Sequence, residues 1–526
     1  MIQLRPSTTT RRFPETLRFP VRQRFEFLAL GGIPTLGFLG HMLVAGRYGY
    51  FRDELYYIAA GHHLALGYVD FPLLIAVLAW GLRLVAGDSL IAIHVVPALA
   101  NCLLILVTGL IARELGGRRL AQALAAGASL VCLTFLATAS IFSMDSLDEL
   151  WWTLIAYLLI RLLHRDQPRL WLVIGAVAAI GLLTKVTILF FLAALLLGLL
   201  ATPGRSQLRS RWLWLGAAIA FCGLLPYLIW ELQNGWATIA YWHSYLGTLV
   251  GHSPVDFLLQ QAYVMNPLTL PLWLGGEAWL LRGRGGPALR SLGIAFALLF
   301  LWFSIGPSKS YYLAPAYPFL FAAGAVWLAP KLTRQGSRWP GAVCLGGLAL
   351  SGLLLAPIAM PILPPPTFAA AYSFLGTDAG AQMERHQGAA LPQWLADRFG
   401  WRSLTRRVSL LMLQLPPSER PAACIFTANY GEAAALDFYG AGSRLPPAVS
   451  GSNSFFFFGP GRCSGRVVVT VGLPPNQVAR SFGSVHRLGI THCDYCMPAE
   501  DGLPILLASK PRRPIPQLWK TGENLG

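Results

Sequence analysis

Long apolar runs alternate with short polar segments over the first 360 residues of the chain. A helix needs roughly 20 mostly apolar residues to cross a bilayer. Most of these runs approach that length, so we expect about 11 membrane-spanning helices. The predicted spans are residues 25–46, 91–112, 120–141, 150–163, 170–184, 187–201, 212–230, 267–281, 288–305, 313–329 and 341–360.

The charges of the short segments predict how these spans are oriented. Loops on the cytoplasmic side of a membrane carry an excess of Lys and Arg, and residues 1–24 contain six arginines. We therefore expect a cytoplasmic basic N-terminus. The apolar segment 72–87 is short and contains Arg83. If it crossed the membrane, the basic segment 113–119 would be external, so we interpret 72–87 as an interfacial or re-entrant helix.

The pattern changes beyond residue 360. The proline-rich run at 361–366 predicts a stiff connector, after which the composition becomes globular. Strand-like runs at 408–413, 423–428 and 466–472 are separated by helical or glycine-rich stretches. The tail is long enough to bury its own core. The predicted fold class is an all-α polytopic membrane protein with about 11 transmembrane helices plus interfacial helices. Residues 25–360 form its membrane module, and 361–526 form a small C-terminal α/β extracytoplasmic domain.

Composition supports a membrane protein and argues against a nucleic-acid-binding one. The chain is 55% hydrophobic with a mean hydropathy of +0.53, above the usual range for soluble domains. Its net charge is +17, but the basic residues cluster between apolar runs, as in cytoplasmic loops. No cleavable signal peptide is evident in the polar N-terminal segment. We expect a multi-pass protein of the cell (inner or plasma) membrane.

The eight cysteines divide evenly between the two parts of the chain. Four lie in apolar runs, where cysteine behaves as a small buried hydrophobic residue. The other four are external in the predicted topology, and in that compartment they can form two disulfides. A zinc site that includes the C-x-x-C pair is the alternative, although the remaining spacings fit no standard zinc pattern. Disulfides are favoured with their connectivity open for Cys424, Cys463, Cys493 and Cys496.

The first predicted external loop, residues 48–72, is unusually polar for a chain that is only 12% charged. Ionised groups close to a membrane are costly and are usually functional. Two adjacent histidines in this loop would face different directions on a helix, and no further ligand set accompanies them. We therefore predict no metal site. The charged residues of the loop are Arg52, Asp53, Glu54 and Asp70.

Polar residues far apart in the sequence all fall at the external ends of the predicted spans. A fold that gathers these ends would build one polar site at the outer membrane face. Plainer roles compete with this interpretation, because acids before helices act as N-caps, lysines snorkel and tyrosines form interfacial belts. The residues concerned are Asp53, Glu54, Asp70, Asp145, Lys185, Lys309, Tyr311 and Tyr312.

Four motifs occur in the order found in a known family. They are YFRDELYYIAAGHHLALGYVDFP (50–72), FSMDSLDELWWT (142–153), GLLTKVT (181–187) and KSYYLAPAYPFLFAAGAVWL (309–328). Together they resemble bacterial members of the protein mannosyltransferase and aminoarabinose transferase superfamily, glycosyltransferase family 39, which has the GT-C membrane fold. Two C-terminal motifs, ANYGEAAALDFYG and CDYCMP, resemble the tail of a bacterial subgroup.

The resemblance implies an activity and a set of site residues. Members of the family transfer a sugar from a polyprenyl-phosphate carrier, on the non-cytoplasmic face, to an acceptor. Asp53 would be the catalytic carboxylate, and Glu54 would orient it or pair with Arg52. The acceptor would be a lipid, a glycan or a protein. The donor phosphate and sugar would be bound by Arg52, Tyr68, Asp70, Asp145, Lys185, Lys309, Tyr311 and Tyr312.

One position departs from the family pattern. In the aminoarabinose-transferring branch a lysine precedes the proline of the first loop, whereas this chain has Phe71 before Pro72. The departure puts in doubt how the donor phosphate is held. It also weakens any transfer of that branch's substrates to this chain.

The chemistry that these residues suggest is a single displacement. Asp53 would accept the proton of the acceptor as a general base, and the anomeric centre would be inverted. A covalent route would need a second carboxylate close by as nucleophile. A membrane transporter or lipid flippase is the alternative function, but transporters place polar sites near the bilayer midplane in repeated halves. Here the acids lie at span ends, and we detect no internal repeat. A non-catalytic receptor would leave the clustered acids unexplained.

Overall fold

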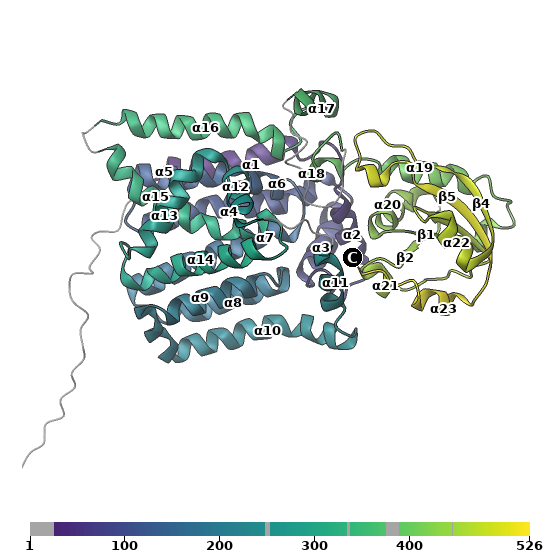
Figure 1. Cartoon of the computed structure of the whole chain (residues 1–526), viewed down its shortest axis with the longest axis horizontal. Coiled ribbons are helices and arrows are strands. Elements are labelled where there is room, and N and C mark those ends of the chain that lie inside the picture. Colours follow the sequence, from purple (N-terminus) through teal and green to yellow (C-terminus); the bar gives the residue numbers. More distant parts are fainter. Residues whose placement is uncertain (1–25, 248–252, 334–336, 375–388, 444, 526) are drawn as a thin grey trace, which may run out of the picture.

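The computed structural model describes residues 26–247, 253–333, 337–374, 389–443 and 445–525. The predicted cytoplasmic segment 1–24 lies outside these residues. A bundle of long helices forms one part of the molecule, and a smaller domain built around a sheet forms the other (Figure 1). The membrane module is therefore all-helical within the described residues, and the C-terminal domain is mixed α/β, as the sequence pattern indicates.

The helical bundle contains α1 to α16, and α17 leads from it toward the second domain. Several of these helices are short, and the long helices α10, α14 and α16 lie roughly parallel to one another (Figure 1). Their bounds are α1 Ile33–Val44, α2 Arg52–His62, α3 Leu74–Ala86, α4 Leu90–Glu114, α5 Arg119–Leu130, α6 Leu133–Thr138, α7 Met144–Arg165, α8 Leu170–Thr184, α9 Ile188–Leu200, α10 Arg211–Gln233, α11 Ala237–Leu246, α12 Pro254–Val264, α13 Leu270–Leu281, α14 Arg290–Ile305, α15 Tyr317–Leu332, α16 Trp339–Ala359 and α17 Pro365–Phe374.

Five helical segments of the described chain are long and apolar enough to cross a membrane, or six if the bent pair of Ile188–Leu200 and Pro203–Arg209 counts as one span. Shorter apolar helices cover Leu28–Val44, Leu74–Ala86 and Leu170–Thr184. The expected count of about 11 spans therefore remains a prediction. The five clear segments are Leu90–Glu114, Arg211–Gln233, Pro287–Ile305, Ser310–Leu332 and Trp339–Ala359.

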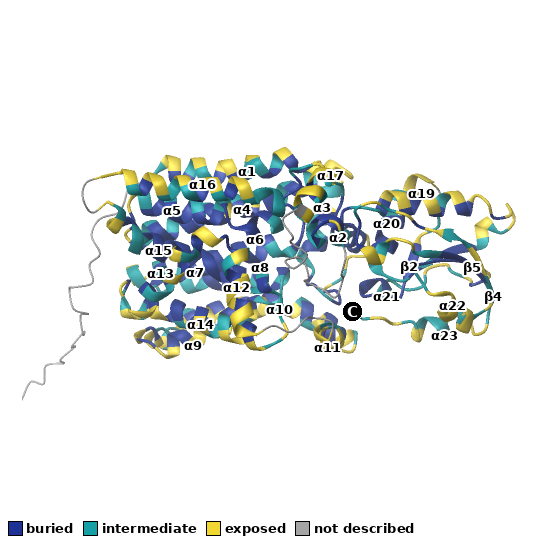
Figure 2. Ribbon diagram, turned by 45° about the horizontal axis from the view of Figure 1, so that its top comes forward, coloured by how far each residue is buried: buried dark blue, intermediate teal, exposed yellow. Residues whose placement is uncertain are grey.

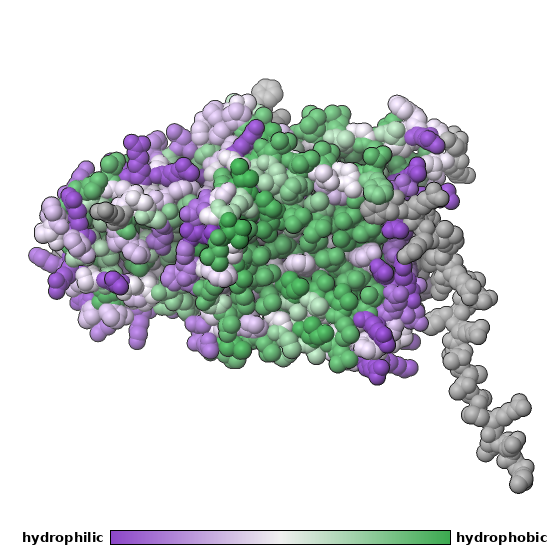
Figure 3. Space-filling model, turned by 180° about the vertical axis from the view of Figure 1, so that it is seen from behind, coloured by the Kyte–Doolittle hydropathy of each residue, from purple (hydrophilic) through white to green (hydrophobic). Residues whose placement is uncertain are grey.

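Buried and lipid-accessible helices are clearly separated. In the most apolar 18-residue stretch of Ser310–Leu332, 78% of the residues are buried inside the protein. In the corresponding stretch of Trp339–Ala359, only 17% are buried. The inner helices appear dark in Figure 2, and α9, α10 and α16 carry many exposed residues. On the face drawn in Figure 3 a broad apolar surface covers the bundle, while polar residues collect on the C-terminal domain and at the opposite end. Such a distribution is that of a multi-pass membrane protein.

The segment predicted as one continuous span at 120–141 is broken. Helix α5 ends at Leu130 and the short helix α6 begins at Leu133. The amide Nδ2 of Asn266 donates to the carbonyl of Val131 at 3.1 Å, and Thr134 Oγ1 donates to the carbonyl of Val264 at 3.1 Å. The first bond satisfies a carbonyl that a continuous helix would pair within itself, so a side chain from outside the segment stabilises the break. The second bond connects α6 to the end of α12.

The C-terminal domain contains a five-stranded sheet in the order β2-β1-β3-β5-β4. Strands β1 to β3 are parallel, and β5 pairs antiparallel with both β3 and β4. The strands predicted at 423–428 and 466–472 are confirmed as β1 and β3. The strand bounds are β1 Ala423–Thr427, β2 Ala448–Ser450, β3 Val467–Val471, β4 Phe482–Ile490 and β5 Pro504–Pro511.

The strand predicted at 408–413 is wrong, because this segment is the end of helix α19, Trp401–Met412. Buried residues recur along this helix at helical spacing, among them Trp401, Leu404, Val408 and Leu411. The short run VSLLML conceals that period. The other helices of the domain are α18 Gln393–Ala396, α20 Tyr430–Gly440, α21 Ser454–Phe458, α22 Pro475–Ser481 and α23 Ile515–Lys520.

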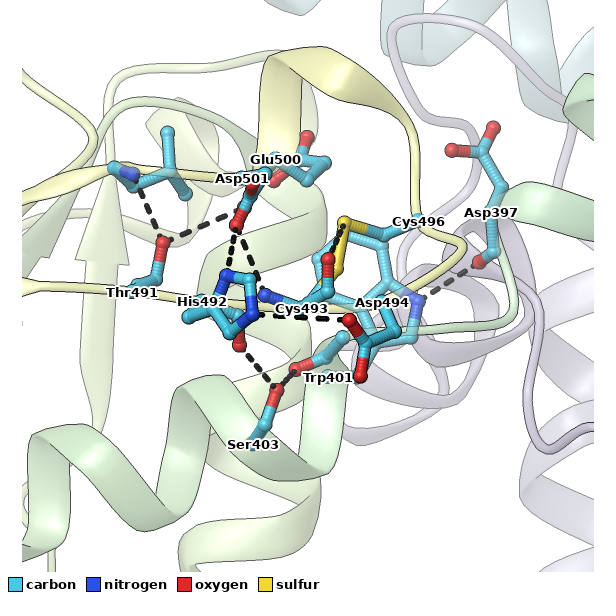
Figure 4. The surroundings of a disulfide bond; sticks show 12 residues. Asp397, Trp401, Ser403, Thr491, His492, Cys493, Asp494, Cys496, Glu500 and Asp501 are labelled. Carbon is cyan, nitrogen blue, oxygen red and sulfur yellow. Dashed lines mark hydrogen bonds and ion pairs between the residues drawn. A yellow bond between two sulfur atoms is a disulfide. The ribbon is translucent and has the colours of Figure 1, made fainter. Parts of the chain in front are cut away.

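Two disulfides connect the four C-terminal cysteines, as predicted, and the structure decides their connectivity. They are Cys424–Cys463 and Cys493–Cys496. The second closes a tight loop whose backbone N–H of Cys493 donates to Asp501 at 2.9 Å (Figure 4). Among the described residues no group of three or more His, Cys, Asp or Glu side chains could hold a metal ion.

Candidate functional site

Helix α2 begins with a charged first turn that divides into an open and a buried carboxylate. Phe51 is its N-cap in extended conformation, and the Glu54 side chain accepts a hydrogen bond from the Phe51 N–H at 2.8 Å. This capping satisfies one of the free N–H groups that every helix start leaves. As a result Glu54 points into the protein, whereas the Asp53 side chain is 30% exposed.

Glu54 is fully buried and its oxygens are occupied. Besides capping α2, it accepts from the backbone N–H of Phe142 at 2.6 Å and lies 2.8 Å from Nε2 of His94. Burial by itself would raise the pKa of Glu54, but the adjacent His94 holds that pKa below its ordinary value. Glu54 therefore ties α2 to α4 and to the start of α7, and it positions its neighbour Asp53.

Asp53 receives its main partner from the other domain. The hydroxyl of Tyr430, the first residue of α20, donates to Asp53 Oδ1 at 2.8 Å. Arg52 Nε lies 3.4 Å from the same oxygen, and its guanidinium stands over the Tyr430 ring and pairs with Asp397. The sequence motif around Tyr430 resembles the tail of a bacterial subgroup but does not by itself predict a part in this site.

Asp70 is also held by the C-terminal domain. Its Oδ1 accepts from the hydroxyl of Tyr56 at 2.9 Å, and its Oδ2 accepts from Nδ2 of Asn453 at 3.3 Å. The same tyrosine oxygen accepts from the backbone N–H of Ser454. Burial raises the pKa of Asp70 to about 7, against the hydrogen bond from Tyr56, and the charge of Asp53 adds to the rise.

Tyr68 and Phe71 lie inside the protein and support the loop that carries Asp70. The Tyr68 hydroxyl is within 3.1 Å of the backbone of Ala60, His63 and Ala65. Its ring stacks on Phe71 with centroids 4.6 Å apart. Both side chains are 1% exposed. Tyr68 thus lies away from solvent. Phe71, the position at which this chain departs from the family pattern, belongs to an aromatic cluster.

A second group of site residues forms where α7 starts and α8 ends. Ser143 caps α7, and Asp145 in its first turn lies 2.5 Å from Nζ of Lys185, the residue that follows α8. Nζ also stands over the rings of Tyr311 and Tyr312, at 5.8 and 5.5 Å from their centroids. A small cavity here is lined by Asp145, Asp148, Glu149, Lys185, Thr187, Tyr311, Tyr312 and Pro315.

Lys309 extends this cationic region toward α11. Its Nζ lies 5.2 Å from the ring centroid of Tyr245 and 5.9 Å from that of Tyr311. A cation over an aromatic face is attracted by the ring quadrupole, so the tyrosines hold both lysines on the same side of the site. Sequence reasoning predicted the lysines and the Tyr311–Tyr312 pair but gave no role to Tyr245.

The two groups of residues share one neighbourhood. Burial, and then the charges of Asp53, Asp70 and Asp145, raises the pKa of Tyr57 on α2. Burial also raises the pKa of Tyr241 on α11, to which the charges of Asp70 and Asp53 contribute. The charges of Asp53, Asp70 and Asp145 therefore all act on Tyr57, and those of Asp70 and Asp53 also act on Tyr241. Asp53 is the partly exposed carboxylate of this neighbourhood, and Lys185 joins it through the ion pair with Asp145.

Comparisons with known proteins bear on the family and the fold. The model of a family described as "Dolichyl-phosphate-mannose-protein mannosyltransferase" matches residues 70–230. The resemblance to the mannosyltransferase and aminoarabinose transferase superfamily is confirmed. A search of curated proteins finds no significant match.

Two solved structures have the same overall fold as this chain. One is ArnT from Cupriavidus metallidurans bound to undecaprenyl phosphate, with a TM-score of 0.58 and 14% identity, covering 91% of this chain and 97% of that one. The other is the apo state of the same protein, with a TM-score of 0.54, 15% identity and the same coverage of both chains. The chain therefore has an ArnT-like GT-C fold with a small C-terminal sheet domain.

Proposed function

We propose that this protein is an integral-membrane glycosyltransferase. It would move a sugar from a polyprenyl-phosphate-linked donor to a lipid, glycan or protein acceptor on the external face of the cytoplasmic membrane. One observation supports this proposal most directly: the charges of Asp53, Asp70 and Asp145 all act on the same tyrosine, Tyr57. Of these carboxylates Asp53 is partly exposed, and Asp145 pairs with Lys185. The fold shared with a protein bound to undecaprenyl phosphate supports a lipid-phosphate donor.

In this mechanism Asp53 is the general base. Tyr430 donates to Oδ1 of Asp53, so Oδ2 is the oxygen that accepts the proton of the acceptor hydroxyl or amine. As that proton leaves, the acceptor atom bonds to the anomeric carbon and the bond to the carrier phosphate breaks. A single displacement of this kind inverts the anomeric centre, and a positioned base contributes roughly 10²- to 10⁴-fold to such a step.

The leaving phosphate carries negative charge that the site must stabilise. Lys185 and Lys309 are held by ring contacts and, for Lys185, by the ion pair with Asp145. Cations fixed in a partly dry site stabilise developing charge better than mobile ones in water. We assign the donor phosphate to these lysines together with Tyr311 and Tyr312. Arg52 neutralises part of the charge beside Asp53.

The orientation in the membrane belongs to the same proposal. The C-terminal domain supplies Tyr430 and Asn453 to the site, so the site and this domain lie on one side of the bilayer. The excess of basic residues in the predicted short loops places the opposite side in the cytoplasm. The N-terminus would then be cytoplasmic and the C-terminal domain extracytoplasmic.

The test is a transfer assay with purified protein in lipid nanodiscs. A panel of radiolabelled polyprenyl-phosphate sugars is supplied with a membrane extract as acceptor, and wild type is run beside Asp53→Asn. Asp88→Asn is the matched control, because Asp88 is an exposed acid that pairs with Arg83 instead of facing the site. We expect transfer by wild type and the control and a loss of roughly 100-fold or more in Asp53→Asn. Full transfer by folded Asp53→Asn would refute the mechanism, and no transfer from any donor would favour the flippase alternative.

A further inference from the structure

Arg398 is a buried arginine that the proposed mechanism does not use. It follows α18, which lies where the helical bundle meets the C-terminal domain (Figure 1), and it is only 3% exposed. Burying a guanidinium is costly unless hydrogen bonds or an opposite charge compensate it. Its Nη1 has no hydrogen-bond partner among the described residues, so packing alone would favour an apolar side chain here. The role of Arg398 therefore lies in the bonds that its other nitrogens make.

Those bonds join the C-terminal domain to the membrane module. Nε of Arg398 donates to the carbonyl of Trp394 at 3.2 Å, one helical turn back along the chain. Nη2 donates to the carbonyl of Ser140 at 2.6 Å and to Ser140 Oγ at 3.1 Å. Ser140 belongs to the α6–α7 connection, residues 139–143, which leads into the helix turn that contains Asp145. Arg398 therefore holds the segment from which α7 starts.

The residue before Arg398 contacts the helix that carries the proposed base. The backbone carbonyl of Asp397 accepts from the N–H of Arg52, the first residue of α2, at 3.0 Å. The first N–H groups of a helix have no partner within it, so this carbonyl caps α2 from the C-terminal domain. Asp397 Oδ2 also lies 3.7 Å from Arg52 Nη2. Two consecutive residues, Asp397 and Arg398, therefore reach α2 and the segment before α7, the two helices whose first turns supply carboxylates to the site.

Glu54 grips the same α6–α7 connection from the membrane module. Its Oε1 accepts from the N–H of Phe142, two residues beyond Ser140, at 2.6 Å. The connection is thus bonded to α2 through Glu54 and to the C-terminal domain through Arg398. The charges agree with this arrangement: burial raises the pKa of Glu54, whereas His94 and then Arg398 lower it. Without the bonds of Arg398, the connection would keep the weaker of two attachments, and segments with fewer fixed contacts open more readily.

We propose that Arg398 is a positioning residue for sugar transfer: it holds the first turn of α7 in register with that of α2 and thereby fixes Asp145 relative to Asp53. The inference rests on the function proposed above, because it takes Asp53 as the base and the Asp145–Lys185 pair as part of the donor site. A displacement of about 1 Å between reacting groups can cost roughly 100-fold in rate. Arg398 is buried and bonds to backbone and to Ser140, so we assign it no contact with substrate.

Steady-state transfer by the full chain in nanodiscs tests this role. Arg398→Gln cannot make the three bonds of the arginine, and kcat should fall by about 10- to 100-fold while KM for the donor changes by less than about threefold. Arg398→Lys keeps the charge and can still donate to the Ser140 carbonyl. It should recover part of kcat, although a lysine lacks the fork of a guanidinium. Arg406→Gln, which changes an exposed arginine on α19, is the matched control and should behave as wild type.

A double-mutant cycle separates positioning from a general loss of stability. If Arg398 acts through Asp145, then adding Arg398→Gln to Asp145→Asn should lower kcat/KM by less than about threefold beyond Asp145→Asn alone, because residues that act as a unit are not additive. Losses that multiply in full would overturn the proposal. A wild-type kcat in Arg398→Gln that is folded, as judged by its Tm, would overturn it as well.

Hydrogen–deuterium exchange tests the same contacts without any transfer reaction. In Arg398→Gln, peptides that cover 50–56 and 139–146 should exchange faster than in wild type, because exchange reports local opening, and peptides of α10 should be unchanged. Unchanged exchange at 139–146 would overturn this inference and leave the proposed function standing. Faster exchange at both peptides, in a protein whose wild type transfers no sugar from any donor, would instead refute the proposed function and with it the catalytic role of Arg398.

Discussion

The hydroxyl of Tyr430 donates a 2.8 Å hydrogen bond to Oδ1 of Asp53, across 377 residues of sequence. The contact joins the first turn of α2 in the membrane module to the first turn of α20 in the C-terminal domain. A parallel contact joins Asn453 to Asp70. The C-terminal domain is therefore part of the candidate site, and its removal would take one hydrogen-bond partner from each carboxylate.

Tyr430→Phe is expected to reduce kcat for sugar transfer by about tenfold with little change in KM, because it removes one hydrogen bond to the proposed base. Steady-state transfer in nanodiscs measures both parameters. Tyr263→Phe on the exposed side of α12 is the control and should behave as wild type. An unchanged kcat for Tyr430→Phe would show that Asp53 does not need this partner.

Lys185→Gln and Asp145→Asn should each weaken donor use, and the effects of the two changes should not be additive. The two side chains form one ion pair, and residues that interact directly show coupling energies of roughly 0.5–3 kcal/mol in double-mutant cycles. The measurement is kcat/KM for the single and double variants. Lys331→Gln, a lysine that lies over Trp327 on α15, is the control. Strictly additive losses would argue that the pair does not act as a unit.

Glu54→Gln is expected to destabilise the protein by about 1–3 kcal/mol, because the new amide NH₂ must face one of the donors that Glu54 now satisfies. Those donors are the backbone N–H groups of Phe51 and Phe142 and the ring of His94. Thermal unfolding in nanodiscs should show a lower Tm, whereas Asp53→Asn should unfold close to wild type. A Glu54→Gln variant of normal Tm that lacks activity would instead indicate direct participation in the reaction.

Stability should depend on pH through Asp70. Its pKa is raised from 3.8 to about 7 in the folded protein, so between those values the native state binds more protons than the unfolded chain. By linkage, the contribution of this group to stability is present at low pH and is lost as pH rises from about 4 to about 7. The fall in Tm between about pH 5 and pH 8 should be smaller in Asp70→Asn than in wild type. Asp88→Asn should keep the wild-type fall, and an equal fall in Asp70→Asn would contradict the assignment.

Several features could be predicted from the sequence because they depend on local patterns. Apolar runs indicate a polytopic helical module, and short strand-like apolar runs indicate β1 and β3. The charged first turn of α2 and the lysine after α8 lie at element ends that the same patterns locate. The ordered motifs also indicate the resemblance to a known family, which the comparisons confirm.

Other features depend on contacts between distant segments, which hydrophobic periodicity does not encode. The break between α5 and α6 is stabilised by Asn266, more than a hundred residues away. Trp401 and Leu411 show their common buried face only when the whole of α19 is considered. The sequence places Asp53 and Glu54 side by side, and the residue pattern alone does not separate their roles, which the family resemblance only suggests.

What the sequence by itself determined is the order of the apolar segments, the segment ends at which charged residues collect, and the family motifs. Only the tertiary structure decided that Glu54 is buried against His94 while Asp53 stays open, and that Tyr430 completes the site. The physical reason is that burial and hydrogen-bond partners are properties of packing. Neighbouring carboxylates on one helix turn point in different directions, and the elements that meet each of them come from elsewhere in the chain.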